Sequence, residues 1–120
     1  MWGVYTTAYT EGGHMKKTEA HIQSEILLAL SKRGHRLWRT NAGKVRTIQG
    51  HIIKLMPEGF PDTCGFRKSD GKFIAIEVKT PKGRLSPAQK RFAKFAEKQP
   101  IIYGVARSVE EAIEIVEERD

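Results

Sequence analysis

The chain has 120 residues, 39% of them hydrophobic, and a formal net charge of +7 at pH 7. That length suits one domain with its own hydrophobic core and excludes a multidomain protein. No apolar run approaches the roughly 20 residues of a membrane span, and the single cysteine, Cys64, excludes an internal disulfide. We therefore expect a soluble, cytoplasmic protein with no membrane partner.

The positive charge is concentrated in the middle of the chain. Residues 16–107 hold 20 basic and 7 acidic side chains, a local balance of +13, whereas the tail from Ser108 is acidic. A basic body of this kind suits a polyanion, most often nucleic acid. It suits a basic solubilising surface equally well, so composition leaves both interpretations open.

The first 15 residues show no helical period and end in Gly-Gly-His-Met, which is similar to a cloning scar before Met15. We interpret residues 1–15 as a tag or a disordered extension and residues 16–120 as a single domain.

Residues 16–120 carry signals for both helices and strands. A helix begins at Thr18, a favourable N-cap residue, and ends at Gly34, a favourable residue after a helix. The dipeptide Asp70-Gly71 is typical of a short hairpin turn. The other predicted elements are, in chain order, a strand over 35–40, a turn over 41–44, a strand over 45–55 interrupted at Gln49-Gly50, a loop over 56–61, strands over 62–67 and 72–80, a basic loop over 81–85, a helix over 86–98, a strand over 101–106 and an acidic helix from Ser108. This order indicates an α/β domain with a mixed sheet.

Two carboxylates and one lysine occupy the predicted hairpin, where apolar side chains would stabilise a sheet more. If Asp70-Gly71 are the two central turn residues, Asp62 lies opposite Lys79 and Cys64 lies opposite Glu77. Side chains alternate between the faces of a strand, so this register gathers Asp62, Glu77 and Lys79 at one end of the sheet. An exposed cross-strand ion pair, worth roughly 0–1 kcal/mol, is the simpler explanation.

The first predicted helix adds a third acid. On a helical wheel Glu19 falls in the stripe formed by Ile22, Ile26 and Leu30, whereas Glu25 points away. The helix dipole alone favours a first-turn Glu. An inward Glu beside a sheet with two further carboxylates is nevertheless better explained by a shared divalent cation, because Mg²⁺ takes oxygen ligands.

Several short motifs follow one another in order along the chain. They are Glu-x-x-x-Gln at Glu19 and Gln23, Trp38-Arg39-Thr40-Asn41-Ala42-Gly43, Gly59-Phe60-Pro61-Asp62, Ile76-Glu77-Val78-Lys79, and Leu85-Ser86-Pro87-Ala88-Gln89. From Thr18 to Glu118 this ordered set resembles the VRR-NUC family of the PD-(D/E)XK nuclease superfamily, in its stand-alone phage or bacterial form. The resemblance implies a restriction-endonuclease-like αβββαβ core, in which a mixed central sheet is flanked by helices.

The resemblance also implies the roles of individual residues in metal-dependent phosphodiester hydrolysis. Asp62, Glu77 and the backbone carbonyl of Val78 would hold Mg²⁺, for which Mn²⁺ would substitute, and Glu19 would complete the metal shell directly or through water. Lys79 would position the attacking water and stabilise the developing oxyanion.

Gln89 has two explanations. The family likeness places a glutamine of this motif near the active site, but Ser86-Pro87-Ala88-Gln89 is also a capping box with proline at the first helical position. Both roles are compatible.

Other residues are candidates for contact with the DNA backbone. They are Arg39, Asn41 and Lys44 around a predicted turn, and Lys82 and Arg84 just beyond the Glu77–Lys79 strand. Trp38 is interpreted as a core or interface residue and not as a base-stacking platform.

The function that the resemblance implies is that of a structure-selective endonuclease that cuts branched DNA, in particular four-way (Holliday) junctions, in phage biology or DNA repair. Two symmetric cuts need two active sites, so a homodimer is expected for that substrate. The alternatives are a monomeric flap or restriction-like nuclease acting on duplex DNA, and a basic DNA-binding module without catalysis.

Overall fold

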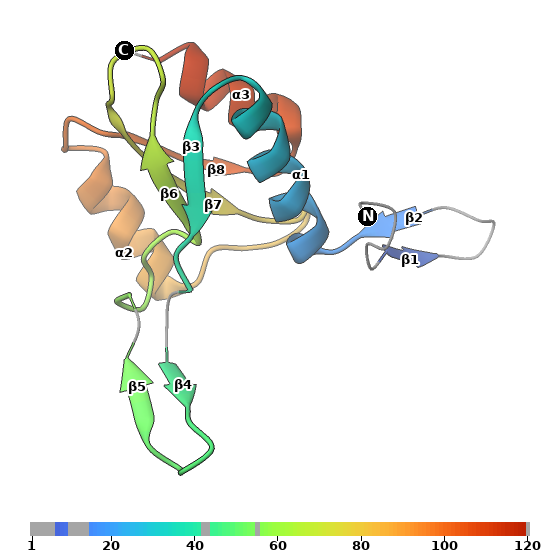
Figure 1. The fold of residues 1–120 in the computed structure, drawn as a ribbon, viewed down its shortest axis with the longest axis vertical. Coiled ribbons are helices and arrows are strands. Elements are labelled where there is room, and N and C mark those ends of the chain that lie inside the picture. Colours follow the sequence, from blue (N-terminus) through green and yellow to red (C-terminus); the bar gives the residue numbers. More distant parts are fainter. Residues whose placement is uncertain (1–6, 10–14, 42–43, 55, 120) are drawn as a thin grey trace.

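A computed structural model describes residues 7–9, 15–41, 44–54 and 56–119 (Figure 1). The turn predicted over 41–44 falls largely outside this part of the chain, because residues 42 and 43 are not described. The elements are β1 (Thr7–Tyr9), β2 (Met15–Lys17), α1 (Glu19–Lys32), β3 (Arg36–Arg39), β4 (Lys44–Arg46), β5 (Ile52–Lys54), β6 (Thr63–Phe66), β7 (Phe73–Val78), α2 (Pro87–Ala96), β8 (Ile102–Ala106) and α3 (Val109–Glu117).

The centre of the protein is a four-stranded sheet in the order β3-β6-β7-β8. The strands β3, β6 and β7 pair antiparallel, whereas β7 and β8 pair parallel, with α2 in the connection between them. Helices α1 and α3 pack together on one face, and α2 lies on the other (Figure 1). The predicted α/β class with a mixed sheet flanked by helices is therefore confirmed.

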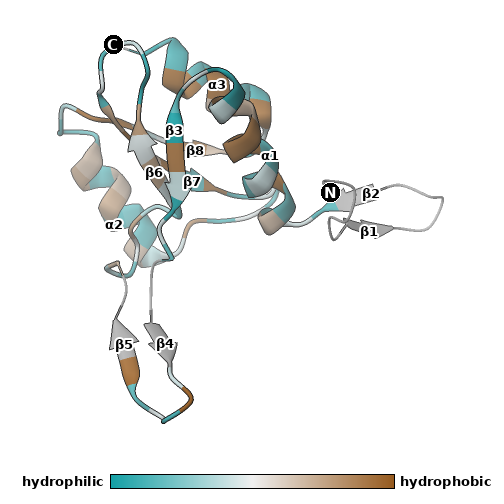
Figure 2. Ribbon diagram, viewed as in Figure 1, coloured by the Kyte–Doolittle hydropathy of each residue, from teal (hydrophilic) through white to brown (hydrophobic). Residues whose placement is uncertain are grey.

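The main core lies between the sheet and the pair α1 and α3. Alternation along β7 directs Ile74, Ile76 and Val78 into this core, and hydrophobic residues recur along the surrounding elements (Figure 2). On the opposite face the ring of Phe92 in α2 contacts Phe60 at a centroid distance of 5.2 Å and Tyr103 at 5.8 Å. No helix in the described part of the chain is long and apolar enough to cross a membrane.

The helix ends are fixed by short-range hydrogen bonds. The side chains of Thr18, Ser86 and Ser108 accept hydrogen bonds from backbone N–H groups three residues further on, as N-caps do. Gly34 has a φ of 95°, a left-handed conformation that ends α1. These helix starts agree with the positions predicted from the sequence.

The predicted register of the β6–β7 hairpin is wrong by two residues. Cys64 pairs with Ala75, not with Glu77, and the ladder places Asp62 level with Glu77, not with Lys79. The connection is longer than a two-residue turn, because the backbone N–H of Arg67 donates to the carbonyl of Lys72.

The side chain of Asp70 explains the longer connection. Its carboxylate binds the guanidinium of Arg67 at 2.7 Å and accepts from the backbone N–H of Lys72 at 3.1 Å. Through these two bonds the Asp70 side chain stabilises the longer loop, and Asp70-Gly71 do not form a two-residue turn. A shift of two residues leaves every side chain on its predicted face, because the period of a strand is two.

Two small hairpins lie outside the main sheet. Strand β1 pairs with β2, and β4 pairs with β5, in the region where the sequence predicts a strand interrupted at Gln49-Gly50. The β4–β5 hairpin projects from the body of the protein (Figure 1). The interpretation of residues 1–15 as a tag or extension stays a prediction.

Candidate metal-binding active site

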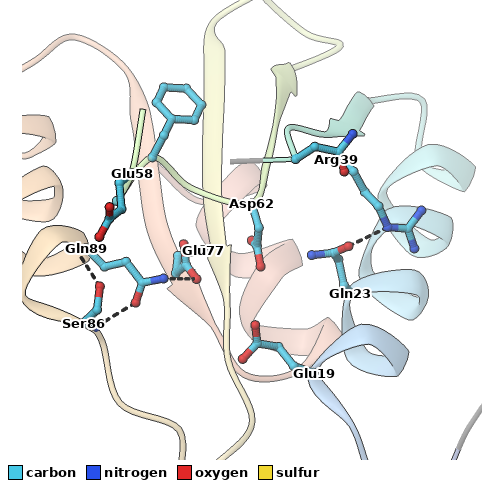
Figure 3. A pocket seen from close by; sticks show the side chains of 11 residues that line it. Glu19, Gln23, Arg39, Glu58, Asp62, Glu77, Ser86 and Gln89 are labelled. Atoms are coloured by element: carbon cyan, nitrogen blue, oxygen red, sulfur yellow. Dashed lines mark hydrogen bonds between the residues drawn. The ribbon is translucent and has the colours of Figure 1, made fainter. Parts of the chain in front are cut away.

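Three carboxylates converge at one end of the sheet (Figure 3). Glu19 is the first residue of α1, Asp62 directly precedes β6, and Glu77 lies in β7. Each offers an oxygen atom, and these atoms all lie within 4.8 Å of one another. Glu77 is 2% exposed, while Glu19 and Asp62 are half-buried.

The backbone around Asp62 fixes the direction of its side chain. Its Oδ1 accepts a hydrogen bond of 2.9 Å from the backbone N–H of Val78, and its carbonyl accepts one of 3.0 Å from Thr40. Asp62 is thereby tied to both neighbouring strands. The preceding loop is held close to α2, since a Cβ at Gly59, whose φ is +90°, would lie 2.6 Å from the carbonyl oxygen of Ala88.

The electrostatic environment opposes ionisation of Asp62 and Glu77. Burial raises the pKa of Asp62 to about 6, and Glu19 adds to this while the N–H of Val78 opposes it. Burial likewise raises the pKa of Glu77 to about 7, with further increases from Asp62 and Glu19 and a decrease from Lys79. A divalent cation would remove the repulsion among these acids, and three carboxylates are the ligands that a hard cation takes.

Lys79 lies beside the carboxylates. Its Nζ is 3.6 Å from Glu77 Oε2, and both side chains are largely buried. The backbone N–H of Lys79 donates to the carbonyl of Ala106, which continues the parallel pairing of β7 with β8. The lysine is therefore close to the acids although it does not oppose Asp62 in the ladder.

Gln89 makes both of the contacts that the sequence left as alternatives. Its side-chain nitrogen donates to Glu77 Oε2 at 3.1 Å, and its side-chain oxygen accepts from the backbone N–H of Ser86 at 2.8 Å (Figure 3). The hydroxyl of Ser86 accepts from the N–H of Gln89 in return, which completes the capping box.

The acids line an open pocket of about 390 Å³. Its other lining residues are Gln23, Arg39, Asn41, Glu58, Gly59, Phe60, Ser86 and Gln89. Arg39 donates to Gln23 Oε1 at 2.6 Å and to the hydroxyl of Ser24 at 2.9 Å, so its guanidinium is held at the rim by α1. Sequence analysis missed Glu58, which occupies an irregular loop where no periodicity indicates its direction.

Of the remaining candidates for DNA contact, Lys82 and Arg84 do not line this pocket. Lys82 borders a separate hollow beside Arg107, which donates to the carbonyls of Thr80 and Gly83 and so holds the loop after β7. Arg84 is exposed on the same loop, and the side chain of Lys44 lies outside the described residues.

A comparison with protein families identifies one domain over most of the chain. The family model of the VRR-NUC domain matches residues 17–110, a range that contains all of the site residues named above. No curated protein and no solved structure matches the chain significantly.

Proposed function

Because the chain belongs to the VRR-NUC family of nucleases, we propose that it is a metal-dependent endonuclease that hydrolyses phosphodiester bonds in branched DNA. The observation that carries this proposal is the convergence of Glu19, Asp62 and Glu77 within 4.8 Å, with Lys79 3.6 Å from Glu77. A basic DNA-binding surface alone would need no such cluster of one buried and two half-buried acids, because carboxylates withdrawn from water without a cation destabilise the fold.

In this proposal the cation is Mg²⁺, with Mn²⁺ as a substitute. Asp62, Glu77 and the backbone carbonyl of Val78 would hold it, and Glu19 would complete its shell directly or through water. A cation held by these residues would lower the pKa of a bound water and would neutralise charge on the scissile phosphate.

The protein's own groups supply the rest of the chemistry. The ammonium group of Lys79 positions the attacking water and stabilises negative charge on the phosphate oxygens as the new bond forms. Gln89 acts through Glu77, whose carboxylate it orients by its 3.1 Å hydrogen bond. Arg39 and Asn41 at the pocket rim, together with Lys44, Lys82 and Arg84, contact backbone phosphates, which position DNA without reading its sequence.

The finer proposal is that the substrate is a four-way junction and the active form a homodimer. One chain supplies one site, and two symmetric cuts across a junction need two sites related by a twofold axis. A monomeric nuclease acting on flaps or duplex DNA is the alternative, and oligomeric state separates the two.

The decisive experiment is a Mg²⁺-dependent cleavage assay on linear duplex, flap and four-way-junction DNA. We expect the wild type to cut branched substrates, and Asp62→Asn and Lys79→Ala to lose cutting while still binding DNA in EDTA. Equal cutting by these variants would remove the catalytic assignment. Binding by the wild type without any cutting in Mg²⁺ or Mn²⁺ would make the chain a DNA-binding module.

A further inference from the structure

Three aromatic side chains lie uncovered on the face of the sheet that carries α2. They are Trp38, Phe66 and Phe73, with exposed fractions of 56%, 46% and 40%. The ladder makes Phe66 and Phe73 direct partners, and the rings of Trp38 and Phe66 meet edge to face with centroids 5.8 Å apart. We call these three residues the aromatic platform. Trp38 is therefore not a core residue.

The aromatic platform and the candidate active site share one face of the sheet. Every second residue of a strand lies on the same face, so Phe66 shares its face with Cys64 and Asp62. In the same way Phe73 shares its face with Ala75 and Glu77. Trp38 pairs with Cys64, one row from the acids. Because a strand advances about 7 Å every two residues, the aromatic platform extends from about 7 to about 14 Å from the carboxylates.

The surroundings of the aromatic platform are basic. Arg36, the ladder partner of Phe66, is exposed on the same face and makes no ion pair with any described residue. Helix α2 packs on this face beside the platform. This helix and the two residues that follow it present four exposed basic side chains against a single exposed acid, Glu97; the four are Lys90, Arg91, Lys94 and Lys98.

This positive charge argues against a second copy of the chain as the partner that binds the aromatic platform. A twofold contact through the aromatic platform would bring Arg36 and the basic helix α2 of each copy towards the same groups of the other, and like charges brought together destabilise an interface. Single-stranded nucleic acid suits both the exposed rings and the basic surroundings, because its bases stack on aromatic rings while its phosphates contact basic groups.

We propose that the aromatic platform stacks unpaired bases of the DNA strand that continues from the scissile phosphate. This inference rests on the proposed nuclease function and narrows its substrate to DNA with unpaired nucleotides next to the cut, as at a flap or at a branch point where base pairs have opened. Stacking on an aromatic side chain contributes about 1–3 kcal/mol per base and does not depend on sequence.

The test measures binding without hydrolysis. The anisotropy of a labelled oligothymidylate of about 20 nucleotides and of a labelled blunt duplex is followed in EDTA for the wild type and variants. Loss of one stacked base predicts that Trp38→Ala weakens binding of the oligothymidylate about fivefold to 150-fold, while duplex binding stays within about twofold. Phe66→Ala, an independent variant, should act in the same direction.

Two substitutions of similar size separate stacking from simple apolar contact. Trp38→Phe retains an aromatic face and should bind the oligothymidylate nearly as the wild type does, whereas Trp38→Leu should resemble Trp38→Ala. The proposal would be overturned if the wild type did not bind the oligothymidylate. It would also be overturned if Trp38→Leu bound the oligothymidylate as tightly as the wild type does. A wild-type dimer that Trp38→Ala converts to monomers in light scattering would overturn it too, because the face would then join two copies.

The outcome is distinguishable from failure of the nuclease function. If Asp62→Asn cuts DNA like the wild type but Trp38 still governs oligothymidylate binding, the catalytic assignment fails and the aromatic platform stands. If Asp62→Asn abolishes cutting while all Trp38 variants bind the oligothymidylate equally, the catalytic assignment stands and the proposed role of the aromatic platform fails.

Discussion

Gln89 donates a hydrogen bond of 3.1 Å to the carboxylate of Glu77 while its own carbonyl oxygen caps the first turn of α2. One side chain thus joins the start of a helix to an acid in the central sheet. Since the helix N-terminus and Glu77 are fixed to each other through this amide, the position of α2 and the direction of the carboxylate are coupled.

Substitutions of Ser86 and Gln89 are therefore expected to differ in their effects on stability and on cleavage. Ser86→Ala removes one half of the capping box and should cost about 1 kcal/mol of stability with little change in cleavage. Gln89→Ala also frees Glu77, so we expect cleavage to fall about tenfold or more, with a higher Mg²⁺ concentration needed for half-maximal rate. Equal Mg²⁺ dependence in the two variants would leave Gln89 with a structural role alone.

Glu19 and Glu25 provide a matched pair on one helix. Glu19 lines the pocket, whereas Glu25 binds Lys17 at 2.9 Å and approaches His21 at 3.4 Å. Glu19→Gln should lower Mg²⁺-dependent cleavage by about tenfold or more, because it removes a metal ligand or the partner of a bound water. Glu25→Gln should cost about 0–1 kcal/mol of stability and leave cleavage unchanged. Comparable cleavage losses in both variants would contradict the assignment of Glu19.

The raised pKa values of Asp62 and Glu77 predict how pH and metal affect stability. The values of about 6 and about 7 lie above those of the unfolded chain, so the folded protein binds more protons across this interval. The resulting stabilisation is full below about pH 4 and is lost as the pH rises through about 7. We therefore expect the melting temperature in EDTA to fall between about pH 5 and 8, and Mg²⁺ to restore it at the upper end only.

Asp62→Asn tests the same pKa argument. Asparagine keeps an oxygen that can accept from the N–H of Val78 but never ionises, so it should raise the free energy of unfolding in EDTA near pH 7.5 by on the order of 1–2 kcal/mol. It should also abolish the Mg²⁺-induced shift in melting temperature. An unchanged Mg²⁺ shift would show that the cation binds elsewhere.

The parts of the fold that follow from local chemistry could be predicted from the sequence. Thr18, Ser86 and Ser108 cap helices through bonds to residues three positions away, and the alternation of β7 depends on the strand period alone. The hairpin register could not be predicted, because it depends on the bond between Asp70 and Arg67. The acids were still expected to converge, since an error of two residues preserves the face of each side chain.

The parts that depend on packing between distant elements could not be predicted. Glu58 lines the pocket from an irregular loop, which lies close to α2 at Gly59. Trp38 has the character of a core residue, but it is 56% exposed on the sheet face that α2 shares. Neither sequence periodicity nor composition contains that information.

A further pair of contacts lies at the acidic C-terminal helix. Glu117 binds Arg33 at 2.6 Å and the buried ring of His35 at 2.9 Å, so it connects α3 to the end of α1 and the start of β3. The backbone N–H of Lys68 donates to Nδ1 of His35, which leaves Nε2 of that ring as the donor to Glu117. Arg33 first, and then His35, lower the pKa of Glu117 to about 2.

Glu117→Gln should therefore destabilise the protein in a pH-dependent way. A lowered folded-state pKa contributes stability that is present above the unfolded value of about 4.5 and is lost as the pH falls towards 2. Allowing for the partial exposure of Glu117, we expect a loss of about 1–2 kcal/mol at neutral pH in urea denaturation. Glu114→Gln, an exposed change on the same helix, should cost less than about 0.5 kcal/mol. A difference between the two variants that stays constant from pH 7 to 3 would show that the charge of Glu117 does not stabilise the fold.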